Sequence, residues 1–256
     1  MSTSNISRYQ NFGFRQAWLE LFFELGDDFW NNDRMGKYMI IGFKTWLKEA
    51  GVTKNNSITA LGTKLREIGV DMPSTWGIIF SNLAYNSPII NWFVRKIECN
   101  REVSNEEMVV LLGDDYSQTV KKNALSSLKE TIRHSPVGDL LGQGECEMKG
   151  RSVTSITRYG WQEPDPLVML YDLYLFAEHS DSLFSFTFSE LMDDNDEREA
   201  MSPNVIFGID GETLRPILQG LAHDYPEFIQ VDFNNALMEN IFLNREKSAA
   251  DVTALL

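Results

Sequence analysis

Three residues of this chain carry side chains that could act on a phosphodiester: Asp139, Glu147 and Lys149. Paired carboxylates with a nearby lysine can hold Mg²⁺ and polarise a phosphate, as they do in many metal-dependent nucleases. Short matches of this type also arise by chance, and Lys149 lies beside a predicted hairpin turn at Lys149-Gly150. The pattern supports a Mg²⁺-dependent nuclease as an alternative hypothesis, and we assign no catalytic residue from it.

Other patterns that would indicate a metal or nucleophilic site are incomplete. The acidic run from Asp193 to Glu197 lacks the glycine and the distant glutamate of a calcium-binding EF-hand loop. The histidines at positions 134, 179 and 223 are isolated and belong to no HExxH motif or nucleophile elbow. The sequence also lacks the glycine-rich phosphate loop of an ATP pyrophosphatase. We therefore expect no metal and no cofactor, and a protein that binds rather than catalyses.

A different set of side chains could neutralise the phosphates of a nucleic acid. Between Arg34 and Glu67 there are seven basic and two acidic residues. Lys37, Lys44 and Lys48 share one face of a helix predicted over residues 33–50, whereas Phe43, Trp46 and their apolar neighbours share the other. A one-sided basic surface is what DNA binding requires, although a solvated helix face gives the same pattern. The predicted DNA contacts here are Arg34, Lys37, Lys44, Lys48, Lys64 and Arg66.

A second group of basic residues follows in a helix predicted from Ser117 to His134 and in the hairpin after it. In the helix, Lys122, Lys129 and Arg133 lie opposite an apolar stripe, and Ser135-Pro136 ends the helix. Ordinary surface charge is the alternative explanation. The predicted DNA contacts of this group are Lys122, Lys129, Arg133, Lys149, Arg151 and Arg158.

The formal net charge of -14 is unevenly distributed along the chain. Residues 1–162 carry 18 acidic and 19 basic side chains, whereas residues 163–256 carry 19 acidic and 4 basic ones. The last third should therefore repel a duplex. We expect it to dock a basic protein partner or to self-associate, and simple solubility is the competing explanation.

The composition is that of a packed globular protein. Of the 256 residues, 43% are hydrophobic, and an apolar signal core or a membrane-length apolar run is lacking. The two cysteines, Cys99 and Cys146, are too few for a disulfide framework or a zinc ribbon, so we expect free thiols. The interpretation is a cytoplasmic protein with no membrane contact.

The order of predicted elements repeats along the chain. Two helices followed by a two-stranded ribbon are expected three times, and in the last third the strands FIQVDF and ALMENIFL are joined at Asn234-Asn235. This order is typical of tandem winged helices, in which a small helical core carries a β-hairpin wing. The predicted fold is therefore mainly α with short β-hairpin wings, in tandem winged-helix modules over residues 1–100, 101–163 and 164–256.

Several stretches resemble one known family over nearly the whole chain. They are RMGKYMIIGFKTWLKEAGV, ITALGTKLREIG, WGIIFSNLAYNSPIINWFV, LYDLYLFAE, FSELM and SPNVIFGIDGETLRPILQGLA, with Gly36-Lys37 and Leu61-Gly62 in the family's order and spacing. The resemblance is to an uncharacterised winged-helix family encoded beside, or fused to, phosphoadenosine phosphosulfate reductase-like proteins in bacterial DNA-modification and phage-defence islands. It implies such a reductase-like protein as a partner, to which any sulfur chemistry would belong.

The preferred hypothesis is a non-enzymatic DNA-binding or adaptor subunit of such a system, with a homo-oligomer as an open alternative. A protein-interaction scaffold without DNA contact is the second hypothesis, and the Mg²⁺-dependent nuclease is the third. The first requires the basic residues of separate helices to lie on one shared surface.

Overall fold

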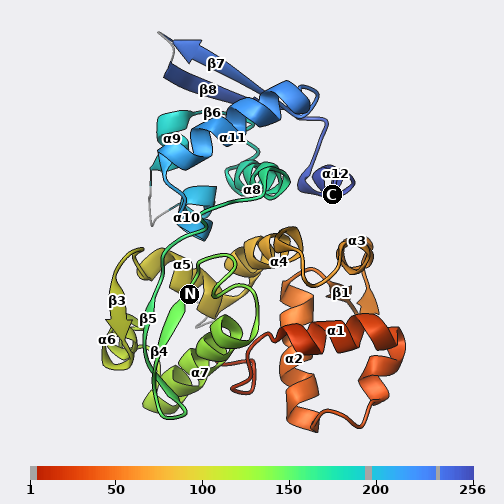
Figure 1. Ribbon diagram of the computed structural model, residues 1–256, viewed down its shortest axis with the longest axis vertical. Coiled ribbons are helices and arrows are strands. Elements are labelled where there is room, and N and C mark those ends of the chain that lie inside the picture. The colour runs from red at the N-terminus through yellow and green to blue at the C-terminus, as the bar shows by residue number, and fades with distance from the viewer. Residues whose placement is uncertain (1–4, 194–197, 235–236) are drawn as a thin grey trace. The chain divides into compact units, whose positions relative to one another are not determined.

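The computed structural model describes residues 5–193, 198–234 and 237–256, and it divides the chain into two compact units, Met1–Gly160 and Trp161–Leu256 (Figure 1). The described residues are mainly helical, with small antiparallel sheets of two or three strands. None of the described helices combines the length and the apolar character needed to cross a membrane. The fold class is thus mainly α with short β elements.

The first half of unit 1 is a group of helices around a short hairpin. Its elements are α1 (Gln16–Leu25), the 3-10 helix η1 (Gly26–Asn31), α2 (Lys37–Glu49), β1 (Thr53–Lys54), β2 (Ser57–Ile58), α3 (Ala60–Ile68), α4 (Pro73–Asn86) and α5 (Pro88–Lys96). Prolines occupy the first turns of α4 and α5, where a missing N–H costs nothing. The Thr59 hydroxyl caps α3 by accepting a hydrogen bond from Gly62 N.

Aromatic side chains fill the core of this half. Helix α4 is buried along nearly its whole length, which explains why its sequence shows no polar face. The ring of Phe14 packs edge-on against those of Phe43 and Trp76, at centroid distances of 5.4 and 5.6 Å respectively. The ring of Tyr9 stacks on Trp46 at 3.7 Å. These contacts join the N-terminal segment, α2 and α4.

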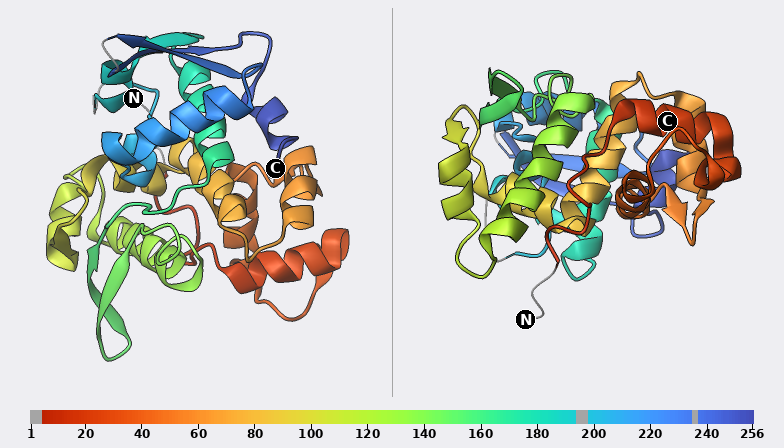
Figure 2. Two further views of the ribbon diagram at one scale, coloured as in Figure 1. Left: turned by 45° about the horizontal axis from the view of Figure 1, so that its top comes forward. Right: turned by 90° about the horizontal axis from the view of Figure 1, so that it is seen from below.

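The second half of unit 1 combines helices with a three-stranded sheet. Its elements are β3 (Glu102–Ser104), α6 (Asn105–Leu111), α7 (Gln118–His134), β4 (Glu145–Lys149) and β5 (Ser152–Thr157), and the strand order is β3-β5-β4. The hydroxyls of Ser104 and Ser117 cap α6 and α7, and the helix predicted from Ser117 accordingly begins there. The hairpin β4–β5 projects from the rest of its unit (Figure 2).

Unit 2 has a similar composition of elements. They are α8 (Pro166–His179), β6 (Ser185–Thr187), α9 (Phe188–Met192), α10 (Pro203–Phe207), α11 (Gly211–Asp224), β7 (Ile229–Asn234), β8 (Leu237–Leu243) and α12 (Ala249–Thr253), with strand order β6-β8-β7. Helix α8 is apolar all round because α10, α11 and α12 all pack against it. The predicted turn at Asn234-Asn235 lies partly outside the described residues.

One succession of elements occurs twice along the described residues. The succession helix, strand, helix, helix, strand, strand occurs from α5 to β5 and, with α10 added, from α8 to β8. In both sheets the last strand lies between the other two. In the first 100 residues, however, the hairpin β1–β2 lies between α2 and α3 and has only two residues in each strand. The described elements of residues 1–100 therefore follow a different order from the succession that occurs in the rest of the chain.

Candidate nucleic-acid interface

The solvent face of α2 carries the basic residues that its sequence predicts. Lys37, Lys44 and Lys48 are exposed, whereas Phe43 and Trp46 on the other face are fully buried. Residues 37, 41, 44 and 48 follow one another at helical spacing, so they form a column along the helix. We call these four residues, with Ile41 among the three lysines, the α2 column.

Buried contacts fix the orientation of α2. A Cβ atom on Gly42 would lie 2.4 Å from the backbone oxygen of Tyr9, so only glycine allows the N-terminal segment to pass this close. The indole nitrogen of Trp46 donates a 2.8 Å hydrogen bond to the backbone oxygen of Phe12. On the exposed side, the Lys44 ammonium lies 5.6 Å from the centre of the Trp30 ring. The face that carries the lysines is thereby held toward solvent.

The other predicted contacts of the N-terminal half lie on neighbouring elements. Arg34 is exposed in the turn before α2 and lies 3.9 Å from Glu24. Lys64 is half-buried on α3, and Arg66 is exposed in the last turn of that helix. These three residues add charge around α2 without joining its column.

Helix α7 presents its predicted residues in three different ways. Lys122 is exposed and, within the described part of the chain, forms no hydrogen bond or ion pair. Lys129 is half-buried, its ammonium donates a 2.9 Å hydrogen bond to Asn105, and burial lowers its pKa. Arg133 is exposed but lies 3.7 Å from Glu130. Lys122 is thus the cation of α7 that is most available to a ligand.

The hairpin β4–β5 carries two exposed cations at its tip. Lys149 and Arg151 flank Gly150, whose φ of 64° forms the turn. Neither side chain forms a hydrogen bond or ion pair within the described ranges. Strand β4 packs against α7, so the hairpin and the helix lie side by side (Figure 1). Two cations therefore stand at the end of a projecting arm beside α7.

The structure overturns the prediction for Arg158. This residue is only 2% exposed, its Nε donates a 2.9 Å hydrogen bond to Gln143, and its Nη1 donates to the backbone oxygens of Val94 and Ile97. Val94 lies in the last turn of α5 and Ile97 is the C-cap residue that follows it, where carbonyl groups lack partners within the helix. Arg158 therefore satisfies the end of α5 in the interior and cannot contact a phosphate.

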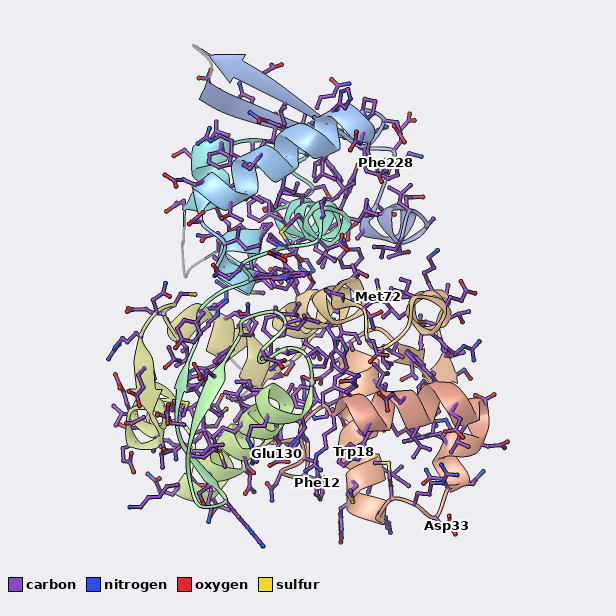
Figure 3. All side chains as sticks on the ribbon, viewed as in Figure 1. Phe12, Trp18, Asp33, Met72, Glu130 and Phe228 are labelled. Carbon is purple, nitrogen blue, oxygen red and sulfur yellow. The ribbon has the colours of Figure 1, made fainter. Side chains whose placement is uncertain are left out.

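Glu130 organises the junction between α7 and the N-terminal segment, near Phe12 and Trp18 (Figure 3). Its carboxylate pairs with Arg15, lies 3.7 Å from Arg133 and lies 3.5 Å from Nε2 of His134. Burial lowers the pKa of His134, whereas Glu130 acts in the opposite direction. Glu130 thus offsets part of the positive charge in the last turn of α7.

A pocket of about 670 Å³ opens between the end of α7 and β4. Asp139 and Glu145 contribute carboxylates to it, and Arg133 and His134 lie in the same lining. The predicted nuclease residues Glu147 and Lys149 do not line it, although both are exposed on β4. The carboxylates that line this pocket are instead those of Asp139 and Glu145.

The residue types that commonly bind metals are dispersed in the described parts of the chain. Within residues 5–193, 198–234 and 237–256, no three residues of the types His, Cys, Asp and Glu group closely enough to hold a metal ion. Most of the acidic run of residues 193–197 lies outside the described residues. Cys99 and Cys146 are free thiols, as expected. Burial raises the pKa of the Cys146 thiol to about 11, so it is protonated at neutral pH.

Comparisons with known proteins give a likeness of fold. No family model and no curated protein sequence matches this chain. A crystal structure of magnesium ion-bound SspB is similar with a TM-score of 0.68 and 13% identity, covering 96% of this chain and 86% of the SspB chain. A second SspB crystal structure gives a TM-score of 0.67 and 14% identity over the same shares. This chain shares the fold of SspB over nearly its whole length.

Sequence reasoning missed two features of this surface. Glu145 was passed over in favour of Glu147 because the two carboxylates lie two residues apart on β4, and only the tertiary structure shows that Glu145 lines the pocket. Tyr38 was also overlooked, although its side chain is 66% exposed at the start of α2. Its position one residue after Lys37, away from the apolar face, was the available signal.

Proposed function

We propose that this chain is a DNA-binding or adaptor subunit of a bacterial DNA-modification or defence system, and that it works with a phosphoadenosine phosphosulfate reductase-like partner. Two tandem winged-helix modules, α5 to β5 and α8 to β8, are the finer fold that we propose. The repeated element order and the matching strand order in the two sheets support this assignment. The resemblance of the sequence motifs supplies the proposed setting.

The observation that carries the proposal is the projecting hairpin with its two cations. In winged-helix proteins a helix enters the major groove while the wing contacts the backbone beside it. Here α7 would take the role of that helix with Lys122, and Lys149 and Arg151 would contact phosphates from the hairpin. The α2 column offers a second contact within the same unit. Exposed cations on a projecting arm fit a long anionic ligand better than a small one.

The acidic unit 2 has a separate proposed role. It carries 19 acidic and 4 basic residues, so it would be repelled by DNA and attracted to a basic protein. We assign the partner contact to this unit. The chain would then connect DNA, which is negatively charged, to a protein partner that is positively charged.

Titration of a fluorescent DNA duplex at low and moderate salt tests this function. Lys149→Gln and Arg151→Gln should each weaken binding and reduce the slope of log K against log salt by about 0.9, as expected for the loss of one phosphate contact. The exposed Arg245 of unit 2 provides the matched control, because Arg245→Gln removes one charge without touching the hairpin. Equal effects of all three substitutions, or no binding by the natural sequence, would reject the proposal.

Cleavage of DNA with Mg²⁺ is a second candidate, favoured by the magnesium ion in one similar SspB structure. The described residues contain no complete cage for a metal, but Mg²⁺ is commonly held by one or two carboxylates together with waters and phosphate oxygens. Asp139 and Glu145 could provide these carboxylates in the pocket beside α7. A bound Mg²⁺ would supply charge stabilisation at the phosphate, and Arg133 would help to bind the strand.

A plasmid-nicking assay with purified protein and Mg²⁺ decides this candidate. Glu145→Gln should abolish nicking, whereas Glu147→Gln, on the same strand but outside the pocket lining, should leave it unchanged. Binding of Mg²⁺ measured by calorimetry should show the same difference. Nicking that survives Glu145→Gln and Asp139→Asn together would exclude this pocket as the site.

A further inference from the structure

Two exposed apolar side chains interrupt the positive charge of α2. Tyr38 is 66% exposed and Ile41 is 40% exposed, although both stand among lysines at the start and middle of the helix. Contacts with phosphates need only the cations, so these apolar surfaces remain unexplained by backbone neutralisation. Proteins that bind unpaired strands combine a row of cations with aromatic side chains, because the bases stack on the aromatic rings. The α2 face therefore carries features for bases as well as for phosphates.

The neighbouring elements narrow the kind of nucleic acid that fits. The residues Glu20 and Glu24 on α1, and Asp27 and Asp28 on η1, are all exposed. Both elements pack against α2, through ring contacts of Trp18 and Phe29 with Phe43. A helix in the major groove, about 12 Å wide, faces phosphates on both sides. The four exposed carboxylates on these two elements would oppose a second row of phosphates, whereas a single strand presents only one row.

The geometry of the cations matches one strand lying along the helix. Lys37 and Lys48 are separated by 11 residues, which corresponds to roughly 16 Å along the axis. The Trp30 ring lies under the Lys44 ammonium at 5.6 Å and restricts its position near the middle of the α2 column. The indole nitrogen of Trp30 in turn donates a 2.9 Å hydrogen bond to the backbone oxygen of Asn56. The central cation is thus placed by the β1–β2 turn.

From these observations we infer that the α2 face binds an unpaired DNA strand, with its phosphates on the α2 column and a base stacked on Tyr38. This inference rests on the proposed DNA binding and specifies the form of DNA that α2 contacts. In this arrangement helix α7 and the β4–β5 hairpin bind the DNA duplex, and α2 binds a DNA strand that is no longer paired. Tyr38 is a positioning residue for the strand, since it touches no reacting group.

Titration of the full chain with a labelled oligothymidylate of about 12 nucleotides, and with a duplex of equal length, tests the inference. Tyr38→Ala should weaken binding of the single strand about tenfold, in line with the loss of one base stack, and change duplex binding less than twofold. Tyr38→Phe should restore binding, because it keeps the ring and removes only the hydroxyl. Tyr38 is highly exposed, so these variants should fold normally, which circular dichroism would verify.

A charge variant separates stacking from phosphate contact. Lys44→Gln should also weaken binding of the single strand and should reduce its salt slope by about 0.7, whereas Tyr38→Ala should leave the slope unchanged. An unchanged single-strand affinity in Tyr38→Ala, or an equal loss for the duplex, would overturn the inference and leave the proposed DNA binding intact. If the natural sequence bound neither oligonucleotide, the inference and the proposed function would both fail.

Discussion

The hydroxyl of Tyr9 donates a 2.6 Å hydrogen bond to Oε2 of Glu49, the last residue of α2. The other carboxylate oxygen lies 2.7 Å from Arg8, and the Tyr9 oxygen lies 2.6 Å from the hydroxyl of Ser87. Burial is the largest influence on the carboxyl and raises the pKa of Glu49 to about 7, although Tyr9 and Arg8 both act to lower it. The end of α2 therefore carries a buried acid that titrates near neutral pH.

The stability of the protein should depend on pH through Glu49. A raised pKa means that the folded state holds the proton more tightly than the unfolded state, so this contribution is full below about pH 4.5 and is lost as pH rises to about 7. Between pH 5 and 8 the free energy of unfolding of the natural sequence should fall by roughly 2 kcal/mol relative to that of Glu49→Gln, whose side chain does not titrate. Urea unfolding of both proteins across this range gives the difference, and parallel stability profiles would contradict the prediction.

Arg158 and Arg151 should respond differently to the same substitution. Arg158→Ala leaves Gln143 and two carbonyl oxygens of α5 without their donor and should destabilise the protein by about 3 kcal/mol. Arg151→Ala, at the exposed tip of the hairpin, should change stability by less than about 0.5 kcal/mol. Chemical denaturation measures both values. A small effect of Arg158→Ala would show that the end of α5 is satisfied in another way.

Two glycines provide a matched pair for backbone packing. A Cβ on Gly13 would lie 2.2 Å from the backbone nitrogen of Thr131, so Gly13→Ala must separate the N-terminal segment from α7 and should cost more than about 2 kcal/mol. Gly220 lies inside α11 with open space around it. Gly220→Ala should stabilise unit 2 by about 0.5 to 1 kcal/mol through helix propensity. Thermal unfolding of the two variants should therefore shift in opposite directions.

Cys146 should react slowly with alkylating agents. Its thiol pKa is raised to about 11 from 9.0, mainly by burial. The smaller thiolate fraction is partly offset by a more nucleophilic sulfur, so the rate at pH 8 should be about tenfold below that of an unperturbed thiol. Iodoacetamide labelling of a Cys99→Ser variant isolates Cys146. A rate equal to that of free cysteine would show that the pocket leaves this thiol fully solvated.

The sequence predicts well those elements whose boundaries are local. The helix ending at His134 begins at Ser117, whose hydroxyl caps it, and ends at Ser135 before a proline, all of which can be read from adjacent residues. The lysines of α2 are exposed because the apolar residues of the same helix must face inward. Strands β3 and β6 were not predicted, since three residues show no alternation and gain their order from pairing with a distant strand.

The candidate site was predictable in its charges but not in its geometry. Lys149 and Arg151 belong to the hairpin tip as expected, because a turn at glycine exposes its neighbours. Arg158 follows the same strand and looks similar in sequence, yet its burial depends on where α5 ends, about 60 positions earlier. The pocket depends on the packing of β4 against the end of α7, which no local pattern specifies. Contacts between residues distant in sequence therefore determine the burial of Arg158 and the lining of the pocket.

The link between Arg158 and α5 has a consequence for how the protein is made. A ribosome completes α5 some 61 to 64 residues before it adds the guanidinium that satisfies the final carbonyls of that helix. At about 5 to 20 residues per second, this delay lasts roughly 3 to 12 seconds. During that interval the nascent chain must leave the helix end hydrated or frayed. A premature stop before position 158 would release a polypeptide whose first 100 residues are complete in sequence. The carbonyl groups at the end of α5 would then lack the hydrogen bonds from Arg158.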